Sequence, residues 1–388
     1  MHDVVLKEGR DRSLRRRHPW VRASSVERVE GAPEAGDWVC VRAATGETLG
    51  YGFYSPASPL RVRMLDFGKE PPGDARIGER IARAVAARAR DPLLAGLDAL
   101  RLVNAEGDGL PGLVADRYGD VVVLRLTHAG MARRRDAIAA ALRDACGAAR
   151  GFERADAAAA RREGFAAQDG VLWGGAPPGR IEIRERGRRY LVDVTHGQKT
   201  GFYLDQRDHR DLVEGLAAGR RVLDLFAYTG GFAVAAVRGG ASALVLVESS
   251  ADALALAREN LDAAGAASCE LVRGDAFEFA RAAGERFDLL IVDPPPLARA
   301  HRDVPAASRA YKDVLLAALR RANPGAYLLV FACSHHVGPE LFAKIAAGAA
   351  ADAARDVQVL RALGAPSDHP VSIHHPEGAY LTGLLLRA

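Results

Sequence analysis

The sequence predicts an α/β protein with a Rossmann-like nucleoside-binding domain at its carboxyl end, preceded by a small β-rich domain and a central α+β domain. Three observations predict this organisation. Residues 221–248 read RVLDLFAYTGGFAVAAVRGGASALVLVE, apolar runs alternate with helical segments beyond them, and residues 37–65 hold short β-rich segments broken by glycine and proline turns. We place the domains at residues 1–72, 73–194 and 195–388.

The segment 221–248 predicts a strand, a loop, a helix and a second strand. Residues 222–226 suit a strand buried on both faces, because the run is largely apolar and too short for a helix. Thr229, Gly230 and Gly231 then form a turn in which glycine lets the backbone approach a ligand closely. Residues 232–238 predict the crossover helix, and residues 243–247 predict the second strand.

The turn predicts a cofactor that has a nucleoside but no diphosphate. It reads AYTGGF and therefore lacks the G-x-G-x-x-G cradle of NAD and FAD sites. S-adenosylmethionine fits, because Asp224 near the end of the first strand would face its cationic methionyl end. Glu248, about twenty positions after the turn, would accept from its ribose hydroxyls. The alternative is a generic βαβ unit in which Glu248 is simply solvated.

The composition narrows the class of protein. A chain of 388 residues has room for two or three domains, and its net charge of +4 permits a nucleic-acid partner without requiring one. Its cysteines (Cys40, Cys146, Cys269, Cys333) form no C-x-x-C pair, which argues against a disulfide framework or a zinc site. No signal peptide and no membrane-spanning apolar run is present. We expect reduced thiols and a cytoplasmic protein.

Basic residues crowd the first part of the chain around His18-Pro19-Trp20. Arg15, Arg16 and Arg17 provide positive charge there, and Trp20 provides an aromatic ring for stacking. These four residues are the predicted RNA-binding group. A solvated basic face is the alternative.

The middle of the chain predicts an α+β domain. We expect helices at residues 81–90 and 131–145, strands at residues 100–103, 112–115 and 121–126, and a hairpin at residues 180–194 around Gly187. The next stretch, THGQKTGFYLDQRDHR, is dense in polar groups just before the nucleoside-binding domain. It predicts either a lid over the cofactor or a surface loop that caps the next helix.

The alternation of strands and helices continues to the carboxyl end. We expect helices at residues 252–264 and 311–322, strands at residues 269–272, 287–292 and 327–332, a turn at residues 323–325, and a terminal hairpin whose second arm is residues 380–386. Asp275 follows the third strand, where its carboxylate would accept from an adenine amino group. Asp293 begins the DPPP loop after the fourth strand, and prolines lock the backbone there.

Cys333 lies at the end of the fifth strand. A free cysteine is often a buried structural residue, but its position one strand after Asp293 favours a nucleophile. The adjacent His335 and His336 lack spaced partners and are a weak ligand set, so we predict no metal site.

Taken in order, QKTGFYLDQRDHR, LDLFAYTGGFAV, DPPP, FACSHH and DHPVSIHHPEGAYL resemble the bacterial 23S rRNA cytosine-5 methyltransferases of the large-subunit methyltransferase I type. The resemblance implies an amino-terminal PUA domain and a carboxyl-terminal class I methyltransferase domain. It also implies 23S rRNA or a large-subunit precursor as partner, and we allow for a homodimer. The loop DPPP departs from the family at Pro296.

Carried over to this chain, the resemblance makes Cys333 the nucleophile and lets Asp293 face the base. The implied cofactor-binding residues are Lys199, Asp205, Arg207, Asp224, Phe226, Tyr228, Thr229, Gly230, Glu248, Asp275 and Asp293.

The chemistry explains why a cysteine would be needed. A thiolate that adds to C6 of cytosine makes C5 nucleophilic enough to take a methyl group. Two alternatives stay open: a methyltransferase of the same fold that acts on a guanine nitrogen, with Cys333 merely packed, and a non-catalytic RNA-binding assembly factor.

Overall fold

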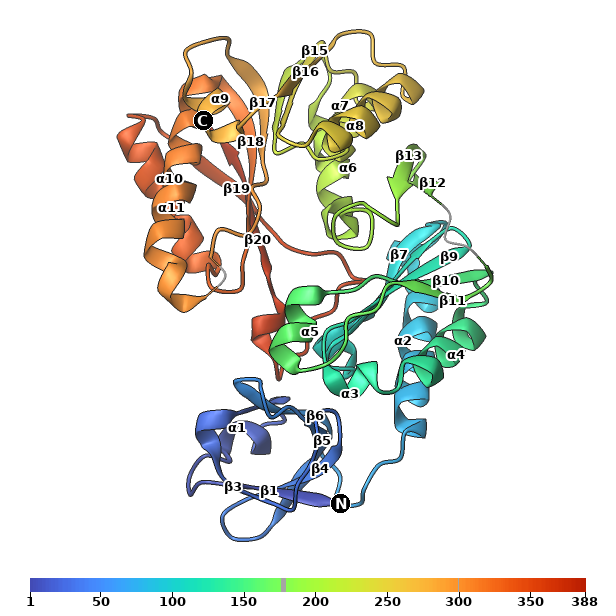
Figure 1. Cartoon of the computed structure of the whole chain (residues 1–388). Helices are drawn as coiled ribbons and strands as arrows, with labels where there is room; N and C mark the ends of the chain where they lie inside the picture. The colour runs from blue at the N-terminus through green and yellow to red at the C-terminus, as the bar shows by residue number, and fades with distance from the viewer. Residues whose placement is uncertain (176–178, 299) are drawn as a thin grey trace. The chain divides into compact units, whose positions relative to one another are not determined.

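The computed structural model describes residues 1–175, 179–298 and 300–388, which divide into two compact units (Figure 1). The first comprises residues 1–181, 193–202 and 367–378, and the second comprises residues 182–192, 203–366 and 379–388. The sequence therefore crosses between the units several times. The domain boundaries at residues 72 and 194 stay a prediction.

The amino-terminal part of the first unit is a six-stranded sheet, as the β-rich composition predicted. Its strand order is β2-β6-β5-β4-β1-β3. The strands are β1 (His2–Leu6), β2 (Trp20–Arg22), β3 (Val26–Glu30), β4 (Trp38–Arg42), β5 (Thr48–Tyr54) and β6 (Leu60–Asp66), with a short helix α1 (Arg12–Arg15). The Gly-Tyr-Gly sequence in β5 allows a close approach to β6, because a Cβ on Gly52 would lie 2.3 Å from the carbonyl oxygen of Arg63.

The central part of the first unit is a five-stranded sheet of order β11-β10-β9-β8-β7, with α2 and α4 packed against one another. Its elements are α2 (Ala75–Arg90), β7 (Ala99–Asn104), β8 (Leu113–Tyr118), β9 (Val121–Leu126), α3 (Ala129–Ala132), α4 (Arg135–Cys146), β10 (Arg150–Glu153), α5 (Ala157–Glu163) and β11 (Gly170–Trp173). The predicted single helix at residues 131–145 is wrong. The chain forms two helices there, and the first is capped by the His128 side chain, which accepts from the Gly130 N–H.

The second unit is built on a seven-stranded sheet of order β16-β15-β14-β17-β18-β20-β19. The strands are β14 (Arg221–Leu225), β15 (Ala243–Glu248), β16 (Cys269–Arg273), β17 (Phe287–Val292), β18 (Ala322–Cys333), β19 (Gln358–Leu363) and β20 (Leu381–Arg387). The first five are parallel, and β20 runs antiparallel to β18 and β19. The hairpin of β12 (Arg180–Glu185) and β13 (Arg188–Asp193) matches the prediction around Gly187.

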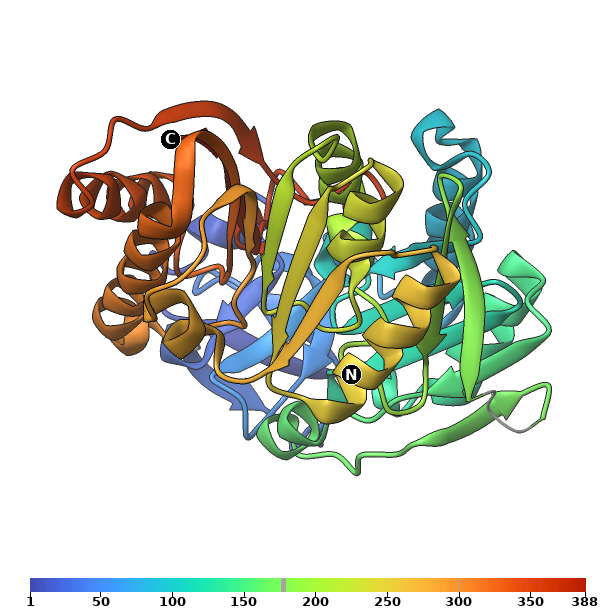
Figure 2. The ribbon, with the colours of Figure 1, turned by 90° about the horizontal axis from the view of Figure 1, so that it is seen from above.

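Helices cover both faces of this sheet (Figures 1 and 2). The helices are α6 (Arg207–Leu216), α7 (Gly231–Arg238), α8 (Ala251–Ala263), α9 (Ala276–Arg281), α10 (Val304–Arg321) and α11 (Pro339–Asp352). The set α6 to α8 packs together on one face, and α9 to α11 packs on the other. Because both faces are covered, β14 and β17 consist almost entirely of buried residues, which is why they read as continuous apolar runs.

Two expectations for the carboxyl end are wrong. Residues 323–325 were expected to form a turn before the fifth strand, but β18 includes them. The pairing of β18 with β17 shifts between Phe287 and Leu289, so these residues form a bulge. The terminal hairpin pairs β20 with β19 and not with residues 368–378, because that segment belongs to the first unit.

Among the residues that the structure describes, no helix is long and apolar enough to cross a membrane.

Candidate active site

Polar side chains gather at the carboxyl ends of the parallel strands in the second unit. Asp224 lies in β14, Glu248 ends β15, Asp293 follows β17 and Cys333 ends β18. The strand order reverses at β14, since β15 lies on one side of it and β17 on the other. Ligands of open α/β sheets bind in the crevice at such a switch point.

The loop after β14 is held in an unusual backbone conformation. Phe226 and Tyr228 have φ angles of 63° and 49°, and Gly230 has 77°. Left-handed conformations cost about 1–3 kcal/mol for residues other than glycine and cluster at ligand sites. Neighbouring elements impose this shape here, since the Ala227 N–H donates to the Val247 carbonyl at 3.1 Å and Asn260 donates to the Thr229 carbonyl at 3.0 Å.

Glu248 is part of the support of this loop. Its Oε2 accepts from the Tyr228 N–H at 2.9 Å, and its Oε1 accepts from the Ser250 N–H at 2.9 Å. Oε1 also accepts from the Ser249 hydroxyl at 3.2 Å, so the side chain is fixed in position and Oε2 is the oxygen that retains a second lone pair for a hydroxyl donor. The predicted role of Glu248 at the ribose stays a prediction that this geometry permits.

Asp224 is an unsatisfied buried acid. The residue is 1% exposed, and its Oδ2 has no hydrogen-bond partner among the described residues. Burial, and then the nearby charges of Asp293 and Glu248, raise the pKa of Asp224 well above its ordinary value of 3.8. Three carboxylates that lie close together at one crevice are stabilised when a cation binds between them.

S-adenosylmethionine answers that requirement, because it carries a sulfonium and an ammonium group. The hydroxyl of Thr229, also buried without a hydrogen-bond partner among the described residues, adds a second open polar group beside the same loop. The residues present therefore fit this cofactor.

Asp275 has a structural task at the amino end of α9. Its Oδ1 accepts from the N–H groups of Phe277 and Glu278 at 2.8 and 2.9 Å. The residue is exposed, and its Oδ2 accepts from none of the described residues. Contact with an adenine amino group stays a prediction for that second oxygen.

Asp293 is held by two residues that sequence reasoning did not single out for this purpose. Gln206 donates from Nε2 to Asp293 Oδ2 at 2.8 Å, and its Oε1 accepts from Nδ1 of His209. Burial lowers the pKa of His209 to about 4, so the ring is neutral at neutral pH. Because Oε1 is committed to His209, the amide of Gln206 can present only its N–H group to Asp293.

Cys333 completes the same cluster. Its Sγ donates to Asp293 Oδ1 at 3.5 Å, and the residue is half-buried, so it is accessible from the crevice. Tyr203 lies in the same surroundings: burial raises its pKa, and Asp293 and then Cys333 raise it further. Its ring stands edge-on to Tyr228, 5.4 Å between centroids.

The predicted cofactor residues that precede β14 are distributed over both units. Asp205 is buried and accepts from the hydroxyl of Tyr380 at 2.6 Å, a partner the sequence did not reveal. Arg207 is fully buried, with its Nε 3.5 Å from Oε2 of Glu185. Lys199 lies in the first unit. Direct cofactor contacts of these three residues stay predictions.

Two members of the predicted RNA-binding group, Arg15 and Trp20, already have partners within the protein, whereas Arg16 and Arg17 form no ion pair with the described residues. Arg15 is paired with Asp11 and Glu47, both at 2.6 Å. The indole N–H of Trp20 donates to Glu106 at 2.8 Å, and the ring stands edge-on to His375 at 4.3 Å, which does not favour stacking on a base. Arg16 and Arg17 are exposed and form no ion pair with the described residues.

Comparison with known families defines the class of protein. A family model described as S-adenosylmethionine-dependent methyltransferase matches residues 116–386, and a model of a PUA-like domain matches residues 4–67. The protein is thus an S-adenosylmethionine-dependent methyltransferase with an amino-terminal PUA-like domain, which confirms the predicted fold class and cofactor.

Individual relatives narrow the class further. The ribosomal RNA large subunit methyltransferase I of Aeromonas salmonicida is 41% identical over 392 residues, covering 99% of both chains. That of Salmonella arizonae is 42% identical over 391 residues, covering 99% of this chain and 97% of the relative. The chain belongs to the ribosomal RNA large subunit methyltransferase I family, as the sequence motifs indicated.

Solved structures agree in fold. A putative S-adenosylmethionine-dependent methyltransferase from Streptococcus mutans is 23% identical, with a TM-score of 0.85 over 100% of both chains. A second putative methyltransferase, complexed with SAH, is 24% identical with a TM-score of 0.86 over 100% of both chains.

Proposed function

We propose that this protein transfers a methyl group from S-adenosylmethionine to C5 of a cytosine in 23S rRNA through a covalent adduct on Cys333. The observation that carries the proposal is the contact of the Cys333 thiol with Asp293, 3.5 Å apart, at the sheet edge where the cofactor crevice lies. A methyltransferase that acts on a nitrogen needs no thiol at this position.

The substrate class follows from the relatives. Their name specifies ribosomal RNA of the large subunit, and they cover the whole length of this chain. An amino-terminal PUA-like domain is consistent with an RNA substrate. We therefore propose large-subunit rRNA, or its precursor, as the partner.

The first chemical step uses only groups of this chain and the base. As the Cys333 S–H bond breaks, sulfur forms a bond to C6, and Asp293 accepts the thiol proton. The electron pair of the C5–C6 double bond moves toward C4, the C4–N3 π pair moves to N3, and Asp293 delivers the proton there. C5 becomes nucleophilic, and the bound S-adenosylmethionine supplies the electrophilic methyl group.

The contacts of Asp293 hold it in place for this proton transfer. One oxygen accepts from Gln206 at 2.8 Å and the other lies against the thiol. The target base has to leave its stack, because a stacked cytosine cannot present C6 to sulfur. Tyr203 and Tyr228 stand beside the loop as aromatic surfaces for a flipped base.

Base-resolution mapping of cytosine methylation in 23S rRNA tests the proposal. Cells that lack this protein should lose one 5-methylcytosine, which returns with the wild-type gene and stays absent with Cys333→Ala. Loss of a methylated guanine instead would transfer the function to the nitrogen-directed alternative. An unchanged rRNA, with cofactor binding intact, would favour the assembly factor.

A further inference from the structure

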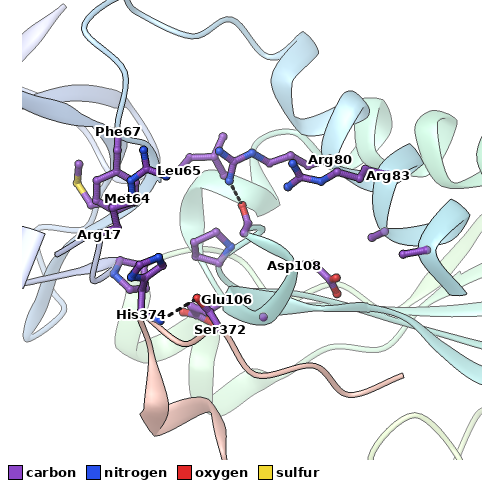
Figure 3. Close-up of a pocket in the computed structure, with 16 residues that line it drawn as sticks. Arg17, Met64, Leu65, Phe67, Arg80, Arg83, Glu106, Asp108, Ser372 and His374 are labelled. Atoms are coloured by element: carbon purple, nitrogen blue, oxygen red, sulfur yellow. Dashed lines mark hydrogen bonds between the residues drawn. The ribbon is translucent and has the colours of Figure 1, made fainter. Parts of the chain in front are cut away.

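The first unit contains a cavity of about 500 Å³ that the methyl-transfer chemistry does not use (Figure 3). Its walls come from three parts of the unit. The amino-terminal part contributes residues 17 and 19, which follow α1, and residues 64, 65 and 67 at the end of β6; the central part contributes α2 and residues 106–111; and residues 372 and 374 complete the wall. A cavity of this volume accommodates a ligand of nucleotide size.

The two acidic side chains of the wall, Asp108 and Glu106, are paired with arginines that do not line the cavity. Asp108 receives two hydrogen bonds from Arg88, at 2.6 and 2.8 Å, and Arg88 does not line the cavity. Glu106 accepts from Arg63 at 3.1 Å and from Trp20 at 2.8 Å. The carboxylates therefore leave little negative charge to oppose an anion in the cavity.

Three arginines line the same wall, and two of them have no carboxylate partner among the described residues. Arg17 and Arg83 form no ion pair and no side-chain hydrogen bond with any residue in the described part of the chain. Arg80, labelled in Figure 3, donates to the Gly109 carbonyl at 2.6 Å. Its Nη2 lies 3.8 Å from Oδ2 of Asp66. Burial lowers the pKa of Arg80, Asp66 offsets part of this effect, and Arg83 and Arg76 lower the pKa further.

Arg17 is held in the wall at a conformational cost. Its φ angle is 62°, in the left-handed region that disfavours side chains, and its N–H donates to the Leu14 carbonyl at 2.7 Å. An unconstrained arginine would rarely adopt this backbone conformation. The end of α1 therefore positions a guanidinium at the cavity.

The wall that contains His374 is anchored on both sides. Asn104 donates to the Pro370 carbonyl at 3.0 Å, and Arg88 donates to the Asp368 carbonyl at 2.9 Å. On the other side, Nε2 of His18 lies 3.3 Å from both oxygens of Glu377. The cavity is thus built in advance of any ligand.

The anchor formed by His18 and Glu377 is a hydrogen bond and not a metal centre. Nδ1 of His18 accepts from the Trp20 N–H at 3.2 Å, so the ring proton is on Nε2 and is donated to Glu377. A metal ion at Nε2 would have to displace that proton from a ring whose other nitrogen is already an acceptor.

The remainder of the wall is apolar and aromatic. Pro19, Met64, Leu65 and Phe67 face the cavity from the amino-terminal sheet, with Ala84 on α2. An apolar surface beside unneutralised guanidinium groups matches a nucleotide, whose base is a flat apolar face and whose phosphate is an anion.

We infer that this cavity binds one nucleotide of the RNA substrate, with its phosphate on Arg17, Arg80 and Arg83 and its base against the apolar wall near Phe67. The inference rests on the proposed RNA substrate. It assigns to the first unit a strand-holding site separate from the cluster at Cys333.

The test compares two arginines of the same helix. Arg83 lines the cavity, whereas Arg90 does not. Both side chains are exposed, and neither forms an ion pair with a residue that the structure describes. Binding of fluorescein-labelled single-stranded oligocytidylate is measured by anisotropy, without cofactor, at several salt concentrations. Arg83→Gln should weaken binding about tenfold and reduce the salt slope by about 0.7, the effect of one lost phosphate contact. Arg90→Gln should stay within about twofold of the wild type.

Equal losses in the two variants, or no loss in Arg83→Gln, would overturn the inference. Equal competition by oligoglutamate would overturn the assignment to RNA, because it would show a general anion site. The assay involves no methyl transfer, so a failure to methylate cytosine would contradict the proposed function and leave this result standing.

Discussion

The Sγ atom of Cys333 donates a hydrogen bond to Oδ1 of Asp293 at 3.5 Å, so the thiol lies beside a carboxylate. A nearby positive charge would favour the thiolate before the base arrives. A carboxylate works differently, because it removes the thiol proton only as sulfur attacks a base and then holds that proton for the ring nitrogen. The adduct should therefore form only with RNA bound.

Replacing Cys333 by serine should reduce methyl transfer by at least about 10³-fold, because a hydroxyl is a far weaker nucleophile than a thiol. Calorimetry should show unchanged affinity for S-adenosylmethionine. With 5-fluorocytosine in the RNA, the wild-type enzyme should form a stable adduct, detected by denaturing electrophoresis, because fluorine cannot leave as a proton does.

Cys269→Ser is the matched control. Cys269 is also half-buried and lies on β16, but burial raises its pKa to about 11, so its thiol is inert at neutral pH. This variant should transfer methyl groups normally. Near wild-type activity in Cys333→Ser, or no adduct during turnover, would contradict the covalent mechanism.

Replacing Gln206 by leucine should lower kcat by about 10- to 150-fold, since a hydrogen bond to a charged group contributes about 1.5–3 kcal/mol. Leucine keeps the volume but leaves one oxygen of Asp293 without its donor. Because Gln206 positions Asp293 and does not touch the base, the KM for RNA should change little. Gln168→Leu, at an exposed position of the first unit, is the control, and an equal kcat in both variants would contradict the role of Gln206.

Much of the site could be predicted from the sequence, because its residues follow the carboxyl ends of strands that the sequence reveals. Parallel strands meet at one edge of a sheet, so short apolar runs followed by Glu248, Asp293 and Cys333 were enough to bring these residues together. The family motifs then supplied the cofactor, which the family match confirms.

The support of Asp293 could not be predicted in this way. Gln206 lies 87 positions from Asp293, and their contact depends on how the start of α6 packs near β17. Local patterns contain no such information. Strand β19 was missed for a related reason: five of its six residues are exposed, so it shows no apolar alternation.

For Trp20, the local sequence pattern indicated a role that the long-range contacts do not favour. A tryptophan among arginines has the composition of an RNA-stacking surface, yet its ring packs against His375, which is 355 positions later. Asn323-Pro324-Gly325 has the composition of a turn, but these residues lie within β18. They form a bulge opposite β17.

Replacing Glu248 by alanine should weaken binding of S-adenosylmethionine and also lower the melting temperature of the cofactor-free protein. Both effects follow because the N–H groups of Tyr228 and Ser250 lose their acceptor, at a cost of roughly 1–3 kcal/mol for each donor that stays buried. Calorimetry and thermal unfolding measure the two effects separately. Asp275→Ala, which removes an exposed cap, should cost only about 1 kcal/mol of stability and affect affinity less. Unchanged affinity in Glu248→Ala would mean that the ribose is held elsewhere.

Replacing Asp224 by asparagine should stabilise the cofactor-free protein while weakening cofactor binding. An acid whose pKa is raised by folding stabilises the folded state only below its unfolded value, near 3.8, and this contribution is lost as the pH rises through the folded value. The wild type therefore loses stability as the pH rises above 3.8, whereas asparagine does not titrate, so Asp224→Asn should melt at a higher temperature than the wild type at pH 8. At pH 4 the difference between the two proteins should shrink.

The same acid makes cofactor affinity depend on pH. A cationic cofactor binds the ionised form of Asp224, so affinity for S-adenosylmethionine should rise as the pH increases through the raised pKa, and Asp224→Asn should show a flatter profile. SAH, which lacks the sulfonium charge, should show a smaller rise than S-adenosylmethionine in the wild type. Isothermal titration calorimetry across this range measures all three profiles. If the wild type and Asp224→Asn gave parallel profiles, another group would be responsible for the pH dependence, and the cationic end of the cofactor would not lie at Asp224.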